Sequence, residues 1–153
     1  MLGNHDYGQS DSSASPETNL ASGIETALDA AGVVVLENQA VEMQLPDSNG
    51  LLYLAGVNSR WADRDDVDEA LADVPDISPR IAMMHNRDTF SQFPPNSAPL
   101  AVAAHTHGGQ VRLPFPPYWS LLKLVQGGNI HAYGWQKIMV KLVINCILMS
   151  VSG

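Results

Sequence analysis

Two short, mainly apolar segments of this chain are each followed directly by a histidine. Residues 80–84 (RIAMM) precede His85, and residues 100–104 (LAVAA) precede His105. Apolar runs of this length between polar loops are typical of buried β-strands. The histidines are therefore expected where a strand ends and a loop begins, which is the edge of an α/β sheet where sites are built.

The remaining patterns alternate between helix and strand. Residues 16–31 show helical spacing of apolar side chains, and Gly32 is placed to end that helix. Residues 33–38 are β-branched and predict a short strand, and residues 40–57 predict a hairpin whose second strand is buried. Residues 63–74 predict a short helix with aspartates in its first turn. Together these elements predict an α/β domain.

Composition narrows the class of protein. The 153 residues suit one domain, and 45% of them are hydrophobic, as in globular chains. The net charge of −8 argues against nucleic-acid binding, because phosphate neutralisation needs clustered Lys and Arg. The single cysteine, Cys146, excludes an internal disulfide and a cysteine-rich zinc site, and it leaves the cellular compartment undetermined.

The histidine pair His105 and His107 is followed by Gly108 and Gly109. In an extended segment, residues i and i+2 point to the same side, so the two imidazoles are expected to lie side by side as metal ligands. The glycines allow a sharp turn and close approach of a ligand. For a histidine taken singly, such as His85, an ordinary half-buried or loop residue is the commoner explanation.

Residues 3–6 (GNHD) add an amide and a second kind of histidine. Asn4 offers a neutral carbonyl oxygen for a metal, and Asp6 is available to orient His5 for proton donation. The alternative interpretation is a polar turn, since Asn, Asp and Gly all favour turns. No strand precedes this motif, so we expect the natural domain to begin before Met1.

Taken together, these residues resemble the calcineurin-like metallophosphoesterase family. Its last three motifs are G-N-H-D/E, a histidine ending an apolar strand, and G-H-x-H. They match residues 3–6, His85 and 104–107 in order, with Ala104 in place of the usual glycine. The family's first two motifs, D-x-H and G-D-x-x-D, have no counterpart in the sequence.

The segment HTHGGQVRLP, residues 105–114, is most similar to bacterial phosphodiesterases and UDP-2,3-diacylglucosamine pyrophosphohydrolases. We therefore expect residues 1–153 to form a single partial domain truncated at its N-terminus, with the tail 136–153 poorly matched.

The resemblance implies a four-layer α-β-β-α sandwich lacking its first strands. It also implies two divalent metal ions (Mn, Fe, Zn or Co) and a bridging hydroxide that attacks phosphorus. Asn4, His85 and His105 would bind one metal and His107 the other. His5 would stabilise the transition state or protonate the leaving oxygen, with Asp6 orienting it.

The implied activity is hydrolysis of a phosphomonoester, phosphodiester or pyrophosphate, on a small-molecule or lipid-linked substrate. Arg112 is equally interpretable as a ligand of the substrate phosphate or as a solvated loop residue. Two alternatives remain open: an inactive chain that binds at most one metal, and a peripheral membrane protein that binds lipid phosphates. The membrane contact would be made by the aromatic and aliphatic loop Phe115–Leu122, whose other interpretation is packing on its own domain.

Overall fold

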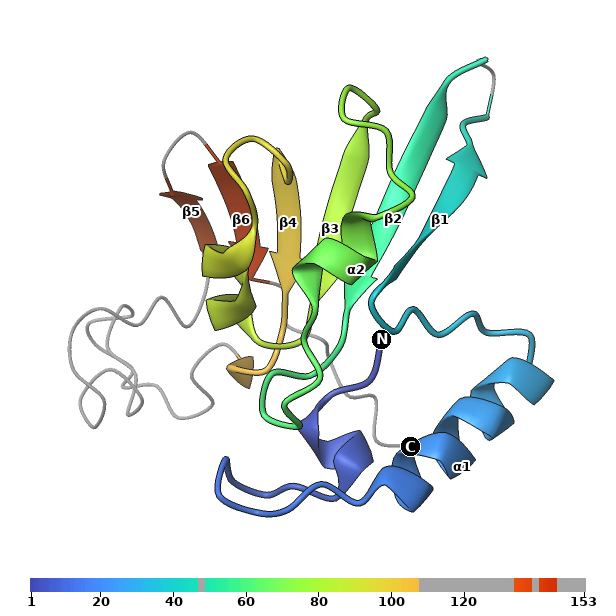
Figure 1. The fold of residues 1–153 in the computed structure, drawn as a ribbon, viewed down its shortest axis with the longest axis vertical. Helices are drawn as coiled ribbons and strands as arrows, with labels where there is room; N and C mark the ends of the chain where they lie inside the picture. The colour runs from blue at the N-terminus through green and yellow to red at the C-terminus, as the bar shows by residue number, and fades with distance from the viewer. Residues whose placement is uncertain (47–48, 108–133, 139–140, 146–153) are drawn as a thin grey trace.

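Six strands of the described residues form one sheet (Figure 1). The computed structural model describes residues 1–46, 49–107, 134–138 and 141–145. The strand order is β1-β2-β3-β4-β6-β5. The strands are β1 (Gln39–Gln44), β2 (Leu51–Val57), β3 (Arg80–Met84), β4 (Leu100–Ala103), β5 (Gly134–Ile138) and β6 (Lys141–Asn145).

The strand directions decide where a site can form. β2, β3, β4 and β6 run parallel to one another, and β1 and β5 are antiparallel to their neighbours at the two edges. The carboxyl ends of β2, β3 and β4 therefore meet at one edge of the sheet. The loops that follow them begin with Asn58, His85 and Ala104.

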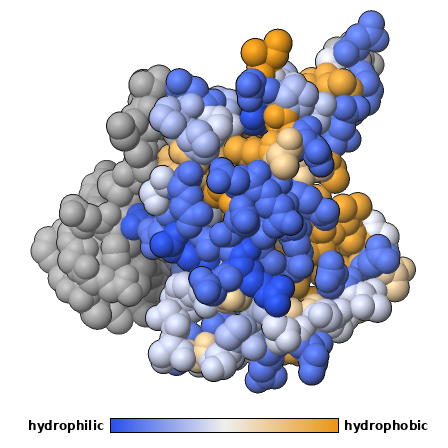
Figure 2. All heavy atoms as spheres, viewed as in Figure 1, coloured by the Kyte–Doolittle hydropathy of each residue, from blue (hydrophilic) through white to orange (hydrophobic). Residues whose placement is uncertain are grey.

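Four helical segments complete the described fold: η1 (Asn4–Tyr7), α1 (Thr18–Ala30), α2 (Val67–Leu71) and η2 (Arg87–Gln92). α2 and η2 pack on one face of the sheet around a core that includes Val57, Met84 and Phe90. α1 packs against η1 through a second cluster of Leu2, Tyr7, Ala21 and Ala62. On the face shown in Figure 2, hydrophilic residues dominate the centre of the view.

Most predicted elements are confirmed. The hairpin is β1 and β2, with Gln39 opposite Gly56 and Gln44 opposite Leu51. The first helix is α1, and Gly32 follows it in the left-handed conformation at φ 77°. The second helix is shorter than predicted and begins after Asp66, whose carboxylate accepts a hydrogen bond from Glu69 N–H at 2.9 Å.

The strand predicted at residues 33–38 is wrong, because these residues form no strand in the structure. Val33 and Val34 are 48% and 68% exposed. Leu36 instead lies over β2, where any side chain at Gly56 would collide with it. A β-branched run becomes a strand only if it pairs with a neighbouring strand, and residues 33–38 pair with none in the described part of the chain.

Residues 1–3 form no strand, as expected, and Asn4 begins the 3₁₀ turn η1. One further local expectation, the extended geometry of residues 105–107, is wrong. β4 ends at Ala103, so His105 and His107 are not in an extended segment. Both have positive φ, 65° and 48°. None of the helices in the described ranges is long and apolar enough to cross a membrane.

Candidate functional site

Three polar side chains from distant parts of the sequence converge at the carboxyl edge of the sheet. His85 follows β3, His105 follows β4 by two residues, and Asn4 begins η1. His85 Nε2 lies 2.8 Å from Asn4 Oδ1 and 3.1 Å from His105 Nδ1. His105 Nδ1 lies 3.1 Å from Asn4 Oδ1. The three donor atoms therefore face a common point.

A hydrogen bond from the side-chain nitrogen of Asn4 determines the orientation of its amide group. Asn4 is 2% exposed, and its Nδ2 donates a hydrogen bond to the carbonyl oxygen of Gln9 at 2.8 Å. A second hydrogen bond, from the Gln9 N–H to the backbone carbonyl oxygen of Asn4 at 2.9 Å, closes the turn. With Nδ2 used in this way, Oδ1 is presented to the two imidazoles.

Gly3 is required by the packing of His85. A Cβ at position 3 would lie 2.5 Å from Cε1 of the His85 ring and 2.6 Å from its Nδ1. Carbon atoms in contact are normally about 3.5–4.0 Å apart. The glycine that precedes Asn4 therefore leaves the space that the His85 imidazole fills.

The electrostatics of the cluster keep the imidazoles neutral. The pKa of His85 is lowered from 6.5 to about 4, chiefly by burial and then by repulsion from other histidines. Burial is also the main cause that lowers the pKa of His105, followed by the charge of His107. A neutral imidazole has a free ring nitrogen, so both histidines are suited to bind a metal ion near neutral pH.

The other predicted residues of the described chain lie around this cluster. His5 is exposed on η1 and His107 is exposed after β4, and both affect the pKa of His85 and His105 through their charge. The Asp6 carboxylate accepts a hydrogen bond from Gly3 N–H at 2.7 Å and so closes the turn that carries His5. Arg112 and the loop Phe115–Leu122 lie outside the described residues.

Two residues near the cluster were missed by the sequence analysis. The Trp61 ring meets the His105 ring at 4.4 Å between centroids and 73° between planes. Gln9, 1% exposed, donates from Nε2 to the carbonyl oxygens of Ala14 and Trp61 at 2.7 and 3.0 Å. The sequence does contain a signal for the loop that carries Trp61, because this loop follows the apolar run 51–57 just as His85 follows the run 80–84.

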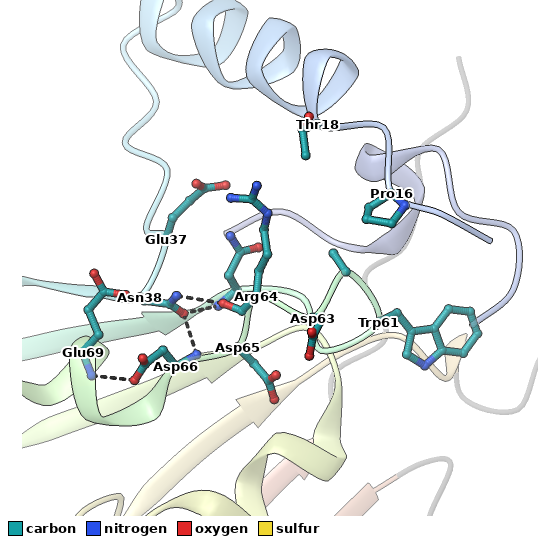
Figure 3. A pocket seen from close by; sticks show the side chains of 12 residues that line it. Pro16, Thr18, Glu37, Asn38, Trp61, Asp63, Arg64, Asp65, Asp66 and Glu69 are labelled. Carbon is teal, nitrogen blue, oxygen red and sulfur yellow. Dashed lines mark hydrogen bonds between the residues drawn. The ribbon is translucent and has the colours of Figure 1, made fainter. Parts of the chain in front are cut away.

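Trp61 also lines a neighbouring cavity of about 890 Å³ (Figure 3). The cavity lies beside the first residue of α1, Thr18, and Glu37 and Arg64 extend into the space below it. Trp61 is therefore shared by the cavity wall and the histidine cluster.

The donor set fits a divalent cation. Donor atoms about 2.1 Å from an octahedral ion are about 3.0 Å from each other, close to the 2.8–3.1 Å spacings among Asn4 Oδ1, His85 Nε2 and His105 Nδ1. The amide is essential to this set. Within the described residues, no group of three or more His, Cys, Asp or Glu side chains is placed to hold a metal.

Comparison with known proteins gives two matches. Over 141 residues the chain is 25% identical to the uncharacterized metallophosphoesterase YkuE of Bacillus subtilis, covering 87% of this chain and 46% of that protein. Over 95 residues it is 34% identical to the phosphodiesterase YaeI of Escherichia coli, covering 60% of this chain and 32% of that protein. The matched regions thus span less than half the length of either relative. No family model and no solved structure matches the chain.

Proposed function

This chain is a relative of the metallophosphoesterases, and from that relationship we propose that it forms part of a metal-dependent phosphoesterase. The observation that supports the proposal most strongly is the meeting of Asn4 Oδ1, His85 Nε2 and His105 Nδ1 within 3.1 Å of one another. Three segments far apart in the sequence thereby bring three neutral donor atoms to one point, which is the arrangement a bound metal ion needs.

Asn4, His85 and His105 would hold one divalent ion, and His107 would contribute to a second. When bound, such ions neutralise phosphoryl charge and lower the pKa of an attacking water. A site of this composition accepts Mn, Fe, Zn or Co. Because the chain has a net charge of −8, attraction of an anionic substrate depends on local positive charge at this edge.

His5 would give a proton to the leaving oxygen. It is exposed on η1, close enough to the cluster for its charge to affect His85. Asp6 contributes by holding this turn through its bond to Gly3 N–H at 2.7 Å. Arg112 would hold a phosphate oxygen of the substrate.

We extend the proposal to the architecture, a four-layer sandwich in which a second sheet covers the face opposite α2 and η2. Along β3 and β4, side chains alternate between fully buried and half-buried. The half-buried set on the second face is wholly apolar and consists of Ile81, Met83, Leu100 and Val102. Parallel strands are normally covered on both faces, which is why an apolar second face supports another layer.

The proposed substrates are small or lipid-linked phosphoesters, including monoesters, diesters and pyrophosphates. No nucleic-acid partner is proposed, in keeping with the acidic composition. For a lipid-linked substrate, the loop Phe115–Leu122 would contact the membrane surface. Flotation with liposomes, compared between the wild type and Trp119→Ser, tests that contact.

The activity test compares the wild type with His105→Ala in hydrolysis of a chromogenic phosphodiester with Mn²⁺ added, alongside metal content per chain. Turnover that requires His105 and two bound ions supports the proposal. One ion or none without turnover supports the alternative, an inactive chain that holds at most one metal. A His105→Ala protein that remains fully active would rule out the assigned role of this residue.

A further inference from the structure

Trp61 is the aromatic neighbour of His105, and the backbone of His105 is in a conformation that needs support. His105 has φ 65°, in the left-handed region that costs a non-glycine residue about 1–3 kcal/mol. Such a conformation persists only when the surrounding structure enforces it. The Trp61 ring packs against the His105 ring, with the centroids 4.4 Å apart and the planes at 73°, and this contact restricts the imidazole.

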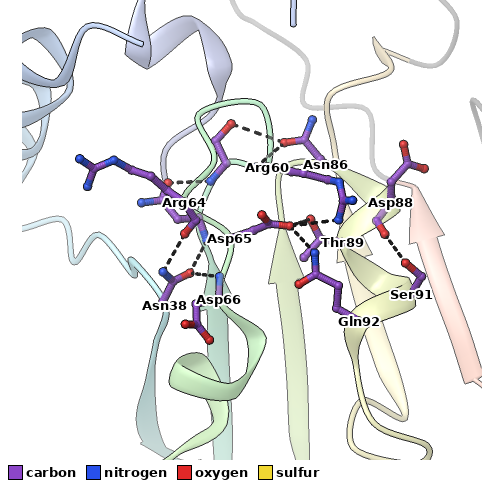
Figure 4. Close-up of polar contacts among 12 residues, drawn as sticks. Asn38, Arg60, Arg64, Asp65, Asp66, Asn86, Asp88, Thr89, Ser91 and Gln92 are labelled. Atoms are coloured by element: carbon purple, nitrogen blue, oxygen red, sulfur yellow. Dashed lines mark hydrogen bonds and ion pairs between the residues drawn. The ribbon is translucent and has the colours of Figure 1, made fainter. Parts of the chain in front are cut away.

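The loop that carries Trp61 is itself held firmly (Figure 4). Asn38 accepts hydrogen bonds at Oδ1 from Asn58 N–H at 3.0 Å and Asp66 N–H at 3.1 Å, one at each end of the loop. Its Nδ2 donates to the Arg64 carbonyl at 2.8 Å. Asn86, next to His85, accepts from Arg60 N–H at 3.0 Å. The loop that carries Trp61 is therefore held at both of its ends by Asn38, and at Arg60 by the residue that follows His85.

A second tie joins Trp61 to Asn4. Gln9 Nε2 donates to the Trp61 carbonyl at 3.0 Å, and the Gln9 carbonyl accepts from Asn4 Nδ2 at 2.8 Å. Gln9 is 1% exposed, so its side of both bonds is shielded from bulk water. One residue thereby sets the position of Trp61 relative to Asn4.

We propose that Trp61 is a positioning residue, which holds the His105 imidazole toward Asn4 and His85. Only the consequence of this role, tighter metal binding, rests on the proposed function. The contact between the Trp61 and His105 rings is present without a metal ion. Groups that orient metal ligands typically contribute about 10–100-fold to metal affinity.

The first experiment is an NMR measurement on metal-free protein with ¹³C-labelled histidine, with His105 signals assigned by comparison with His105→Gln. Wild type and Trp61→Phe are expected to show a cross-relaxation signal between the His85 and His105 rings, whose centroids are 4.9 Å apart. Trp61→Ala is expected to lose it. Tyr53→Ala, which removes a half-buried aromatic ring on β2, serves as the matched control and is expected to keep it.

The second experiment measures Mn²⁺ affinity of the same variants by calorimetry. Trp61→Ala is expected to bind at least about tenfold more weakly, with Trp61→Phe restoring most of the affinity and Tyr53→Ala unchanged. The proposal is overturned if the signal between the rings is unaffected by Trp61→Ala, or if wild type and Trp61→Phe lack it. If wild type binds no Mn²⁺ but the ring signal depends on Trp61, the proposed function fails while the positioning role stands.

Discussion

Replacing Gly3 with alanine would place a methyl group against the imidazole of His85. The new Cβ would lie 2.5 Å from Cε1 and 2.6 Å from Nδ1 of that ring, so the ring must move by about 1 Å to reach a normal contact of about 3.5 Å. The backbone adds no cost, because Gly3 has φ −111° and ψ 177°, which alanine adopts freely. The effect is therefore purely steric.

A displacement of about 1 Å breaks the 2.8 Å approach of His85 Nε2 to Asn4 Oδ1. Forcing a methyl group into a filled space costs about 1–3 kcal/mol. We expect Gly3→Ala to lower the free energy of unfolding by that amount in urea denaturation. We also expect it to weaken Mn²⁺ binding in calorimetry, since His85 is moved out of the donor set.

Gly23→Ala is the matched control, because nothing lies within 4 Å of a Cβ added there. Gly23 is inside α1, so alanine is expected to stabilise the protein by about 0.5–1 kcal/mol and to leave Mn²⁺ binding unchanged. If Gly3→Ala matched wild type in both stability and Mn²⁺ affinity, the packing of His85 against Gly3 would be refuted.

Three further substitutions test other parts of the fold by urea denaturation. Asp66→Ala removes the cap of α2 and should cost about 1 kcal/mol, whereas an unchanged midpoint would contradict the capping role. Tyr7→Phe removes hydroxyl contacts to Asn58 and Glu37 at 3.0 and 3.1 Å and should cost about 1–2 kcal/mol; equal stability would show that these bonds contribute nothing. Val34→Lys should change the free energy of unfolding by less than about 0.5 kcal/mol, because Val34 is 68% exposed. A large loss would instead support the strand predicted at residues 33–38.

The central strands were predictable because their signal is local. Residues 51–57, 80–84 and 100–104 are apolar runs between polar loops, and the structure places β2, β3 and β4 there, with β4 one residue shorter. The segment 33–38 has the same local character without a neighbour to pair with. Pairing is a property of the folded sheet, and composition alone does not contain it.

The candidate site was predictable to the extent that it depends on strand ends. Parallel strands bring their carboxyl ends together, which predicts that His85 and His105 lie close to each other. In the structure His85 Nε2 is 3.1 Å from His105 Nδ1. The conformation of His105 was not predictable in this way, since the extended geometry assumed for residues 105–107 gives way to positive φ. Trp61 and Gln9 were missed because their roles come from contacts between loops.

Anomalous X-ray diffraction from crystals grown with Mn²⁺ shows whether Asn4, His85 and His105 hold a metal ion. We expect a peak at bonding distance from Asn4 Oδ1, His85 Nε2 and His105 Nδ1 together. The absence of a peak among these three atoms in such a crystal, or peaks only elsewhere, would contradict the proposed metal site.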